Sequence, residues 1–119
     1  IMKLIGQTLE EVEEGRVVMK LEPGEHLYNP IGMVHGGAIA TLADVTVMTA
    51  AWSTEQAPES LRGVTISMSV QYLAPARSTD LIAVGRVLHR GKSLVHCEVE
   101  IGTPGGDPVA KAVGTYKIG

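Results

Sequence analysis

The longest apolar stretch of the chain follows a polar, glycine-rich turn and is broken by a single charge. Its apolar side chains are Ala38, Ile39, Ala40, Leu42, Ala43, Val45, Val47, Met48, Ala50, Ala51 and Trp52. A run of this length is too long for a strand, and as a helix of about 17 residues it would be roughly 25 Å long. A helix without a broad polar face is normally buried. The pattern therefore predicts one long core helix.

Shorter segments with strand-like alternation precede this helix. Residues 8–21 predict two short strands joined by a turn at Glu14-Gly15, and Pro23-Gly24 ends the hairpin. After the helix, residues 53–62 predict a polar loop.

The clearest strand pattern lies in residues 64–72. Apolar side chains there alternate perfectly with threonine, serine and glutamine. Such alternation is typical of a strand with one buried face. We therefore expect Val64 and Ile66 on the core face and Thr65 on the polar face.

Three further strands are predicted at Leu81 to His89, Leu94 to Ile101 and Val109 to Ile118. The turns between them are Arg90 to Ser93 and Pro104 to Asp107. The predicted order is two strands, one long buried helix, and an antiparallel meander of four strands. Because the strands are segregated from the single helix, the predicted class is α+β.

Composition and charge narrow the classes of function. The 119 residues, 45% of them apolar, suit one domain over residues 1–119. A net charge of −3 gives no support for a nucleic-acid partner or for binding to an anionic membrane. There is no signal-peptide pattern, and the long apolar run carries Asp44, so we expect no membrane span.

The single cysteine, Cys97, excludes an internal disulfide and fits a reducing compartment such as the cytoplasm. His96 and Glu98 beside it suggest a Cys/His pair. Adjacent residues of a strand point to opposite faces, however, so we interpret Cys97 as a core residue. The histidines show no metal-ligand spacing, and we predict no metal and no cofactor.

Asp44 is the first candidate for chemistry. Burying a carboxylate inside an apolar helix costs several kcal/mol unless it is hydrogen-bonded, paired or protonated. Catalysis is one reason for such a residue. The alternative is a structural carboxylate bonded to Thr41 or to a partner subunit.

Several motifs together resemble the hotdog-fold thioesterases of the phenylacetate-degradation type. They are Asn29-x-x-Gly32-x-x-His35-Gly36-Gly37, an aspartate nine residues after the histidine, Gly63-Val64-Thr65 and Tyr72-Leu73-x-Pro75-Ala76. The resemblance covers nearly the whole chain. It implies a six-stranded antiparallel sheet wrapped round the helix, and a homodimer or dimer of dimers. It also implies sites between protomers that hydrolyse an acyl-CoA, with an aryl-acetyl or medium-chain acyl group.

The resemblance also implies roles for individual residues. The matching positions are Asn29, His35, Gly36, Gly37, Asp44 and Thr65. In the family, Asp44 and Thr65 of one protomer would lie opposite Asn29 and Gly36 of the other. Basic turns in the family often meet the phosphates of coenzyme A. That observation makes Arg90, Lys92 and Ser93 candidate substrate-binding residues, although a charged hairpin turn is usually only solvated.

The chemistry of thioester hydrolysis agrees with these roles. Negative charge develops on the carbonyl oxygen, and the first turn of a helix offers unpaired N–H groups. Gly36 or Gly37 can supply such a donor. Asp44 would act as general base or as nucleophile, and the sequence does not separate the two. Thr65 would hold the water or orient the carboxylate, and Asn29 would position the thioester or the water.

Each role has a structural alternative. His35 could be a helix-start residue bonded to the backbone, and the two glycines could serve close packing. Thr65 could be an ordinary surface threonine, and Asn29 before Pro30 is a good turn residue in any protein.

Two other functions remain open on sequence grounds. One is a hotdog-fold hydratase or dehydratase, because Asn29-Pro30-Ile31 is similar to the hydratase motif. That motif needs an aspartate and a histidine where this chain has Leu27 and Gly32, which argues against it. The other is a non-catalytic acyl-CoA-binding module, against which the intact Asp44 and glycine turn argue.

Overall fold

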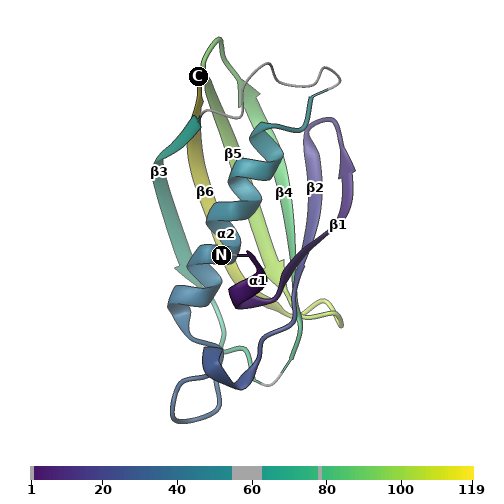
Figure 1. Ribbon diagram of the computed structural model, residues 1–119, viewed down its shortest axis with the longest axis vertical. Helices are drawn as coiled ribbons and strands as arrows, with labels where there is room; N and C mark the ends of the chain where they lie inside the picture. The colour runs from purple at the N-terminus through teal and green to yellow at the C-terminus, as the bar shows by residue number, and fades with distance from the viewer. Residues whose placement is uncertain (1, 55–62, 78) are drawn as a thin grey trace.

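The computed structural model describes residues 2–54, 63–77 and 79–119, which form an antiparallel sheet of six strands curled around one long helix (Figure 1). The elements are α1 (Met2–Ile5), β1 (Gln7–Glu13), β2 (Arg16–Leu21), a 3₁₀ turn (Glu25–Leu27), α2 (Gly36–Ala51), β3 (Gly63–Tyr72), β4 (Leu81–Arg90), β5 (Leu94–Gly102) and β6 (Pro108–Ile118). The predicted α+β architecture, with its central helix, is confirmed. Most of the predicted polar loop, residues 55–62, lies outside the described residues.

The order of the strands across the sheet is β1-β2-β4-β5-β6-β3. β4, β5 and β6 form a meander, but β3 pairs antiparallel with β6 at the edge and not with β4. The predicted four-stranded meander is therefore wrong. Alternation along a strand identifies the strand but contains no information about its neighbour. The chain between β3 and β4 has to travel from one edge of the sheet to its middle.

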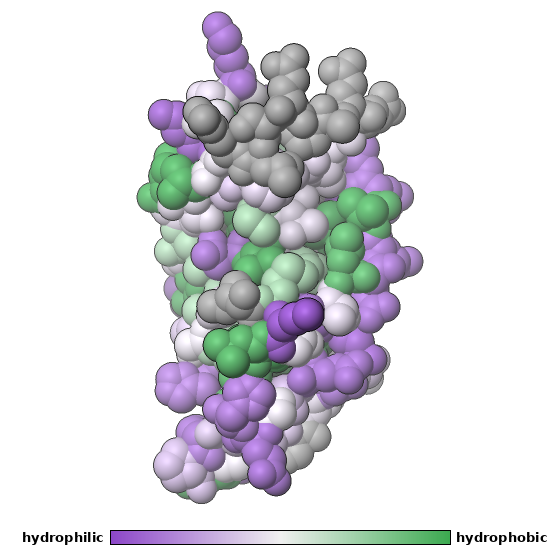
Figure 2. All heavy atoms as spheres, in the orientation of Figure 1, coloured by the Kyte–Doolittle hydropathy of each residue, from purple (hydrophilic) through white to green (hydrophobic). Residues whose placement is uncertain are grey.

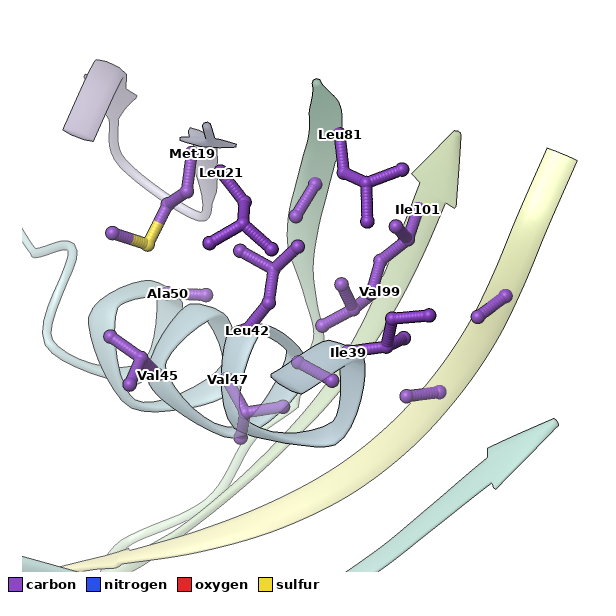
Figure 3. Close-up of a cluster of buried hydrophobic side chains, with 14 of the residues drawn as sticks. Met19, Leu21, Ile39, Leu42, Val45, Val47, Ala50, Leu81, Val99 and Ile101 are labelled. Atoms are coloured by element: carbon purple, nitrogen blue, oxygen red, sulfur yellow. The ribbon is translucent and has the colours of Figure 1, made fainter. Parts of the chain in front are cut away.

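The core lies between α2 and the concave face of the sheet. Figure 3 shows Leu42 and Ile39 of the helix pointing toward side chains of β2, β4 and β5, whereas Val47 lies against Gly114 of β6. The largest side chains that are almost fully buried include Met19, Leu21, Leu42, Leu81 and Ile101. Within the described residues, no helix is long and apolar enough to span a membrane.

Two glycines let the helix approach the sheet closely. A Cβ atom built on Gly85 of β4 would lie 2.7 Å from Cγ2 of Thr46, and one on Gly114 of β6 would lie 3.0 Å from Cγ2 of Val47. Both helix side chains are fully buried. Because interiors are packed as densely as crystals, there is no space for an extra methyl group at Gly85.

Gly85→Ala is therefore expected to lower the free energy of unfolding by about 1–3 kcal/mol, the usual cost of overpacking a core. Equilibrium unfolding in urea measures it. Gly105→Ala is the matched control, because the nearest heavy atom to its added methyl is 3.8 Å away. Equal stability of the two variants would show that α2 does not pack against β4 this closely.

The apolar face of β3 differs from the prediction. Val64 and Ile66 are 55% and 52% exposed, and Thr65 is the residue that turns toward α2. The pairing with β6 shifts register between Thr65 and Ser67, which marks a β-bulge. The bulge adds one residue, so the alternation changes face at this point. The apolar side chains alternate perfectly in the sequence, but they therefore do not all lie on the same face of β3.

Candidate active site

The start of α2 is organised by His35, which occupies the N-cap position. Its Nδ1 atom accepts a hydrogen bond from the Gly37 N–H at 3.0 Å, and its carbonyl oxygen accepts from the amides of Ala38 and Ile39. Capping side chains satisfy N–H groups that have no partner inside the helix. Among the described residues no group accepts from the Gly36 N–H. One free donor therefore remains at the helix start, and it belongs to Gly36, not to Gly37.

Asn29 holds the loop that leads into the helix. Its Oδ1 atom accepts from the amides of Ile31 and Met33, each at 3.1 Å, and its own N–H donates to the Met33 carbonyl at 2.7 Å. Gly32 has a φ of +80°, which favours glycine at this point of the turn. The structural alternative for Asn29 thus has direct support, since its side-chain oxygen is engaged in the turn. No described residue contacts its side-chain NH₂ group by a hydrogen bond.

Asp44 and Thr65 are brought together by α2 and the bulge of β3. The Thr65 hydroxyl donates to Oδ1 of Asp44 at 2.7 Å, and both residues are half-buried. A hydrogen bond to a carboxylate is stronger than a neutral one. The predicted alternative partner, Thr41, instead donates to the Gly37 carbonyl at 2.9 Å. The family resemblance implies that Thr65 could orient the Asp44 carboxylate. The structure places the two side chains in direct contact through this hydrogen bond.

Tyr116 of β6 borders the same carboxylate. It is paired with Thr65 across the sheet and is only 3% exposed. Burial, and secondly the negative charge of Asp44, raise the pKa of the Tyr116 phenol. Tyr116 therefore stays protonated beside Asp44 at neutral pH.

Asp44 and Gly36 do not meet within one protomer. They are eight residues apart on one helix, which corresponds to about 12 Å along its axis. Asp44 shares the less buried side of α2 with Gly37, Ala40 and Thr41, none of which is fully buried. In Figure 2, hydrophobic and weakly polar residues gather over the middle of this face, with hydrophilic residues at the right-hand edge.

Arg90, Lys92 and Ser93 lie at the opposite end of the helix from Gly36. Arg90 Nη1 donates to the carbonyl of Ala51, the last residue of α2, at 2.8 Å. A cation at this end complements the helix dipole. The Ser93 carbonyl accepts from the Ile118 amide, and Lys92 is exposed. The structure therefore does not bring this turn to Asp44 or Gly36 of the same protomer.

Cys97 is a core residue, as the strand pattern indicated. It is 1% exposed, and burial raises the pKa of its thiol to about 11 despite the nearby Arg90. A thiol of this kind carries almost no thiolate at neutral pH and is a poor nucleophile. In the part of the chain that the structure describes, no group of three His, Cys, Asp or Glu side chains is arranged to hold a metal ion.

A cavity of about 300 Å³ opens beside the free amide of Gly36. Its lining includes Met33, Val34, Gly36, Ile39, Tyr72 and Leu73. The sequence interpretation gave Tyr72 no role beyond the motif at the end of its strand, yet its hydroxyl donates to the Gly36 carbonyl at 2.9 Å. A lone tyrosine at the end of a strand gives no signal of this contact, because the two residues are 36 positions apart.

Comparison with known proteins identifies the family to which this chain belongs. A model of the thioesterase superfamily matches residues 31–110 of the chain. Acyl-coenzyme A thioesterase 13 of Homo sapiens is 33% identical over 95 residues, which are 79% of this chain and 66% of that protein. The matched region thus spans slightly less than two thirds of that relative's length.

Solved structures show the same architecture. The E. coli PaaI protein from the phenylacetic acid degradation operon superimposes with a TM-score of 0.84 at 25% identity, over 98% of this chain and 86% of that one. A hypothetical thioesterase protein of Streptococcus pneumoniae TIGR4, solved with coenzyme A, gives a TM-score of 0.83 at 26% identity, over 94% of this chain and 87% of that one. The six-stranded sheet around one helix is thus a hotdog fold of the PaaI type. The chain belongs to the thioesterase superfamily.

Proposed function

We propose that this protein hydrolyses acyl-CoA thioesters to a free acid and coenzyme A. The observation that carries the proposal is the pair of groups on the central helix: a half-buried, hydroxyl-bonded Asp44, and the amide of Gly36, for which no described residue is an acceptor. Two comparisons support the substrate class. The human relative is named an acyl-coenzyme A thioesterase, and the Streptococcus pneumoniae neighbour was solved with coenzyme A.

The proposed chemistry follows from these two groups. The Gly36 N–H donates to the carbonyl oxygen of the thioester, where negative charge develops as the tetrahedral intermediate forms. Asp44 removes a proton from the attacking water, or attacks the carbonyl carbon itself. Thr65 donates to Oδ1 and thereby orients the carboxylate, and no described residue donates to Oδ2, which is the oxygen we assign to the reaction. Collapse of the intermediate breaks the C–S bond, and the coenzyme A thiolate leaves and takes up a proton. When Asp44 is the base, this step gives the free acid directly. When Asp44 is the nucleophile, it leaves an acyl-aspartyl anhydride, which a water molecule then hydrolyses to the free acid and the restored carboxylate.

The proposed site lies between two protomers. Asp44 and Gly36 of one chain are about 12 Å apart along the helix, too far to act on one carbonyl group. A two-fold axis that sets two α2 helices antiparallel brings Asp44 of each chain opposite Gly36 of the other. β3 is an edge strand and exposes Val64 and Ile66, so pairing of two β3 strands would bury apolar surface. We propose a homodimer, or a homotetramer built as a dimer of dimers.

The remaining predicted residues take supporting roles in this proposal. His35 caps the helix and engages Gly37, while the NH₂ group of Asn29 is available to the substrate or the water. The antiparallel arrangement places the end of the partner's helix about 10 Å beyond Gly36. Arg90, Lys92 and Ser93 of the partner chain would then be near enough to meet the phosphates of coenzyme A.

The acyl group is proposed to enter the cavity beside Gly36. Its lining is mostly apolar, and a volume of about 300 Å³ suits an aryl-acetyl or medium-chain acyl group. The acyl class is tested directly by measuring thiol release from a panel of acyl-CoAs that includes phenylacetyl-CoA and straight-chain members.

A complementation experiment tests the shared site. Asp44→Asn and Gly36→Pro chains, each expected to be inactive alone, are co-expressed with different tags and the mixed oligomer is purified. One site of a mixed dimer then contains the native Asp44 and the native Gly36. The purified mixed dimer should recover about half of native activity, because one of its two sites is intact.

Two outcomes would contradict the proposal. If a verified mixed dimer recovers no activity, then either Asp44 and Gly36 of the same chain act in one site, or these residues do not act together in the site at all. Binding of acyl-CoA without thiol release by the native chain would indicate a binding module instead of an enzyme.

A further inference from the structure

The contact between Tyr72 and the helix start has no role in the chemistry described so far. Tyr72 is the last residue of β3, at the edge of the sheet, and its side chain reaches the first residue of α2. The residue is 54% exposed, so burial of its ring does not explain the arrangement. Its hydroxyl donates to the Gly36 carbonyl at 2.9 Å. A Cβ atom on Gly36 would lie 3.6 Å from its ring, so the ring passes close over the glycine.

The peptide group between Gly36 and Gly37 is held at both of its polar atoms. Tyr72 binds its carbonyl oxygen, and Nδ1 of His35 accepts its N–H at 3.0 Å. Two consecutive glycines are the most freely rotating pair of residues in a chain. An external hydrogen bond at each end of their common peptide removes much of that freedom.

The orientation of the free Gly36 N–H depends on this peptide. Gly36 is the hinge between the peptide plane that carries its own N–H and the plane that Tyr72 and His35 hold. The peptide group that carries the Gly36 N–H also contains the His35 carbonyl. That carbonyl is held in place because it accepts from the amides of Ala38 and Ile39. With both planes held, the direction of the Gly36 N–H is fixed, and Gly36 and Tyr72 line the same cavity.

We infer that Tyr72 is a positioning residue, which clamps the Gly36–Gly37 peptide and thereby aims the Gly36 N–H at the substrate carbonyl. The inference rests on the proposed thioesterase function for its effect on rate, but the clamp itself is a property of the free protein. A positioned donor contributes to the transition state more than to substrate binding. Loss of the clamp therefore lowers kcat and leaves KM nearly unchanged.

Tyr72→Phe removes the hydroxyl and keeps the ring. The expected results are a fall in kcat of about 3- to 10-fold, the range of one neutral hydrogen bond, with KM and the melting temperature little changed. Amide hydrogen exchange at Gly37, followed by NMR, is expected to become faster because its peptide loses one anchor. Thr8→Ala is the control: it removes an exposed hydroxyl from β1, at the opposite edge of the sheet, and should change neither kcat nor the exchange rate.

Each outcome decides the inference. Unchanged exchange at Gly37 in Tyr72→Phe would overturn the clamp, and faster exchange with an unchanged kcat would overturn its part in the reaction. An equal rise in KM and fall in kcat/KM would assign Tyr72 to substrate binding alone. If the native chain releases no thiol from any acyl-CoA, the proposed function fails, and the exchange rates still decide whether Tyr72 holds the peptide.

Discussion

Asp44→Asn is expected to lower kcat for acyl-CoA hydrolysis by about 10²- to 10⁴-fold, the range that a positioned acid or base supplies. The amide of asparagine keeps an oxygen to accept the Thr65 hydrogen bond, which is 2.7 Å long in the native protein. Asparagine and aspartate also have similar helix propensities. The loss should therefore appear in kcat, measured by thiol release, and not in the melting temperature.

Asp80→Asn is the matched control for this variant. Asp80 lies on the surface and pairs with Lys20 at 3.6 Å, a contact of the kind that contributes little to stability. The same change of charge there should leave kcat within about twofold, because surface substitutions have small effects. If Asp44→Asn retains nearly native kcat, Asp44 is a structural carboxylate and the mechanism proposed for it is wrong.

Gly36→Pro is expected to lower kcat by about 10²- to 10³-fold, the cost of one lost oxyanion donor. Proline removes the N–H of Gly36 but suits the first position of a helix, where that group has no partner inside the helix. The preceding residue also tolerates it: His35 has φ −59° and ψ 135°, in the extended region that proline requires before it. The helix should form normally, as circular dichroism would verify.

Gly36→Ala separates the lost donor from added bulk. It keeps the N–H, and its methyl group would meet only the Tyr72 ring at 3.6 Å, an ordinary van der Waals distance. We expect a clearly smaller loss of kcat than in the proline variant. Equal losses in the two variants would mean that space above Gly36, and not its N–H, is what the reaction requires.

The family resemblance predicted more of the site than the alternation of residues did. Asp44 was singled out because a lone carboxylate in an apolar helix is costly, and that argument needs only the sequence. Thr65, by contrast, was assigned by alternation to a polar face away from the core. The bulge in β3 turns it toward Asp44, and no local propensity in residues 64–72 indicates where an extra residue enters the ladder.

The choice between Gly36 and Gly37 as donor required side-chain geometry. Both glycines have the same local sequence context, and both could expose an N–H at the helix start. His35 folds back onto Gly37 and leaves Gly36 free. Tyr72 likewise becomes relevant only because β3 pairs with β6 and ends beside the helix.

The sequence by itself determined the six strands of this protein, the buried helix, its unusual aspartate and the glycine turn before it. These features depend on local periodicity and on the cost of burying charge, which act over a few neighbouring residues. Only the tertiary structure decided the strand order, the face of Thr65, the free amide at Gly36 and the contact from Tyr72. Each of these depends on which distant segments pair, and pairing is set by the packing of the whole chain around α2.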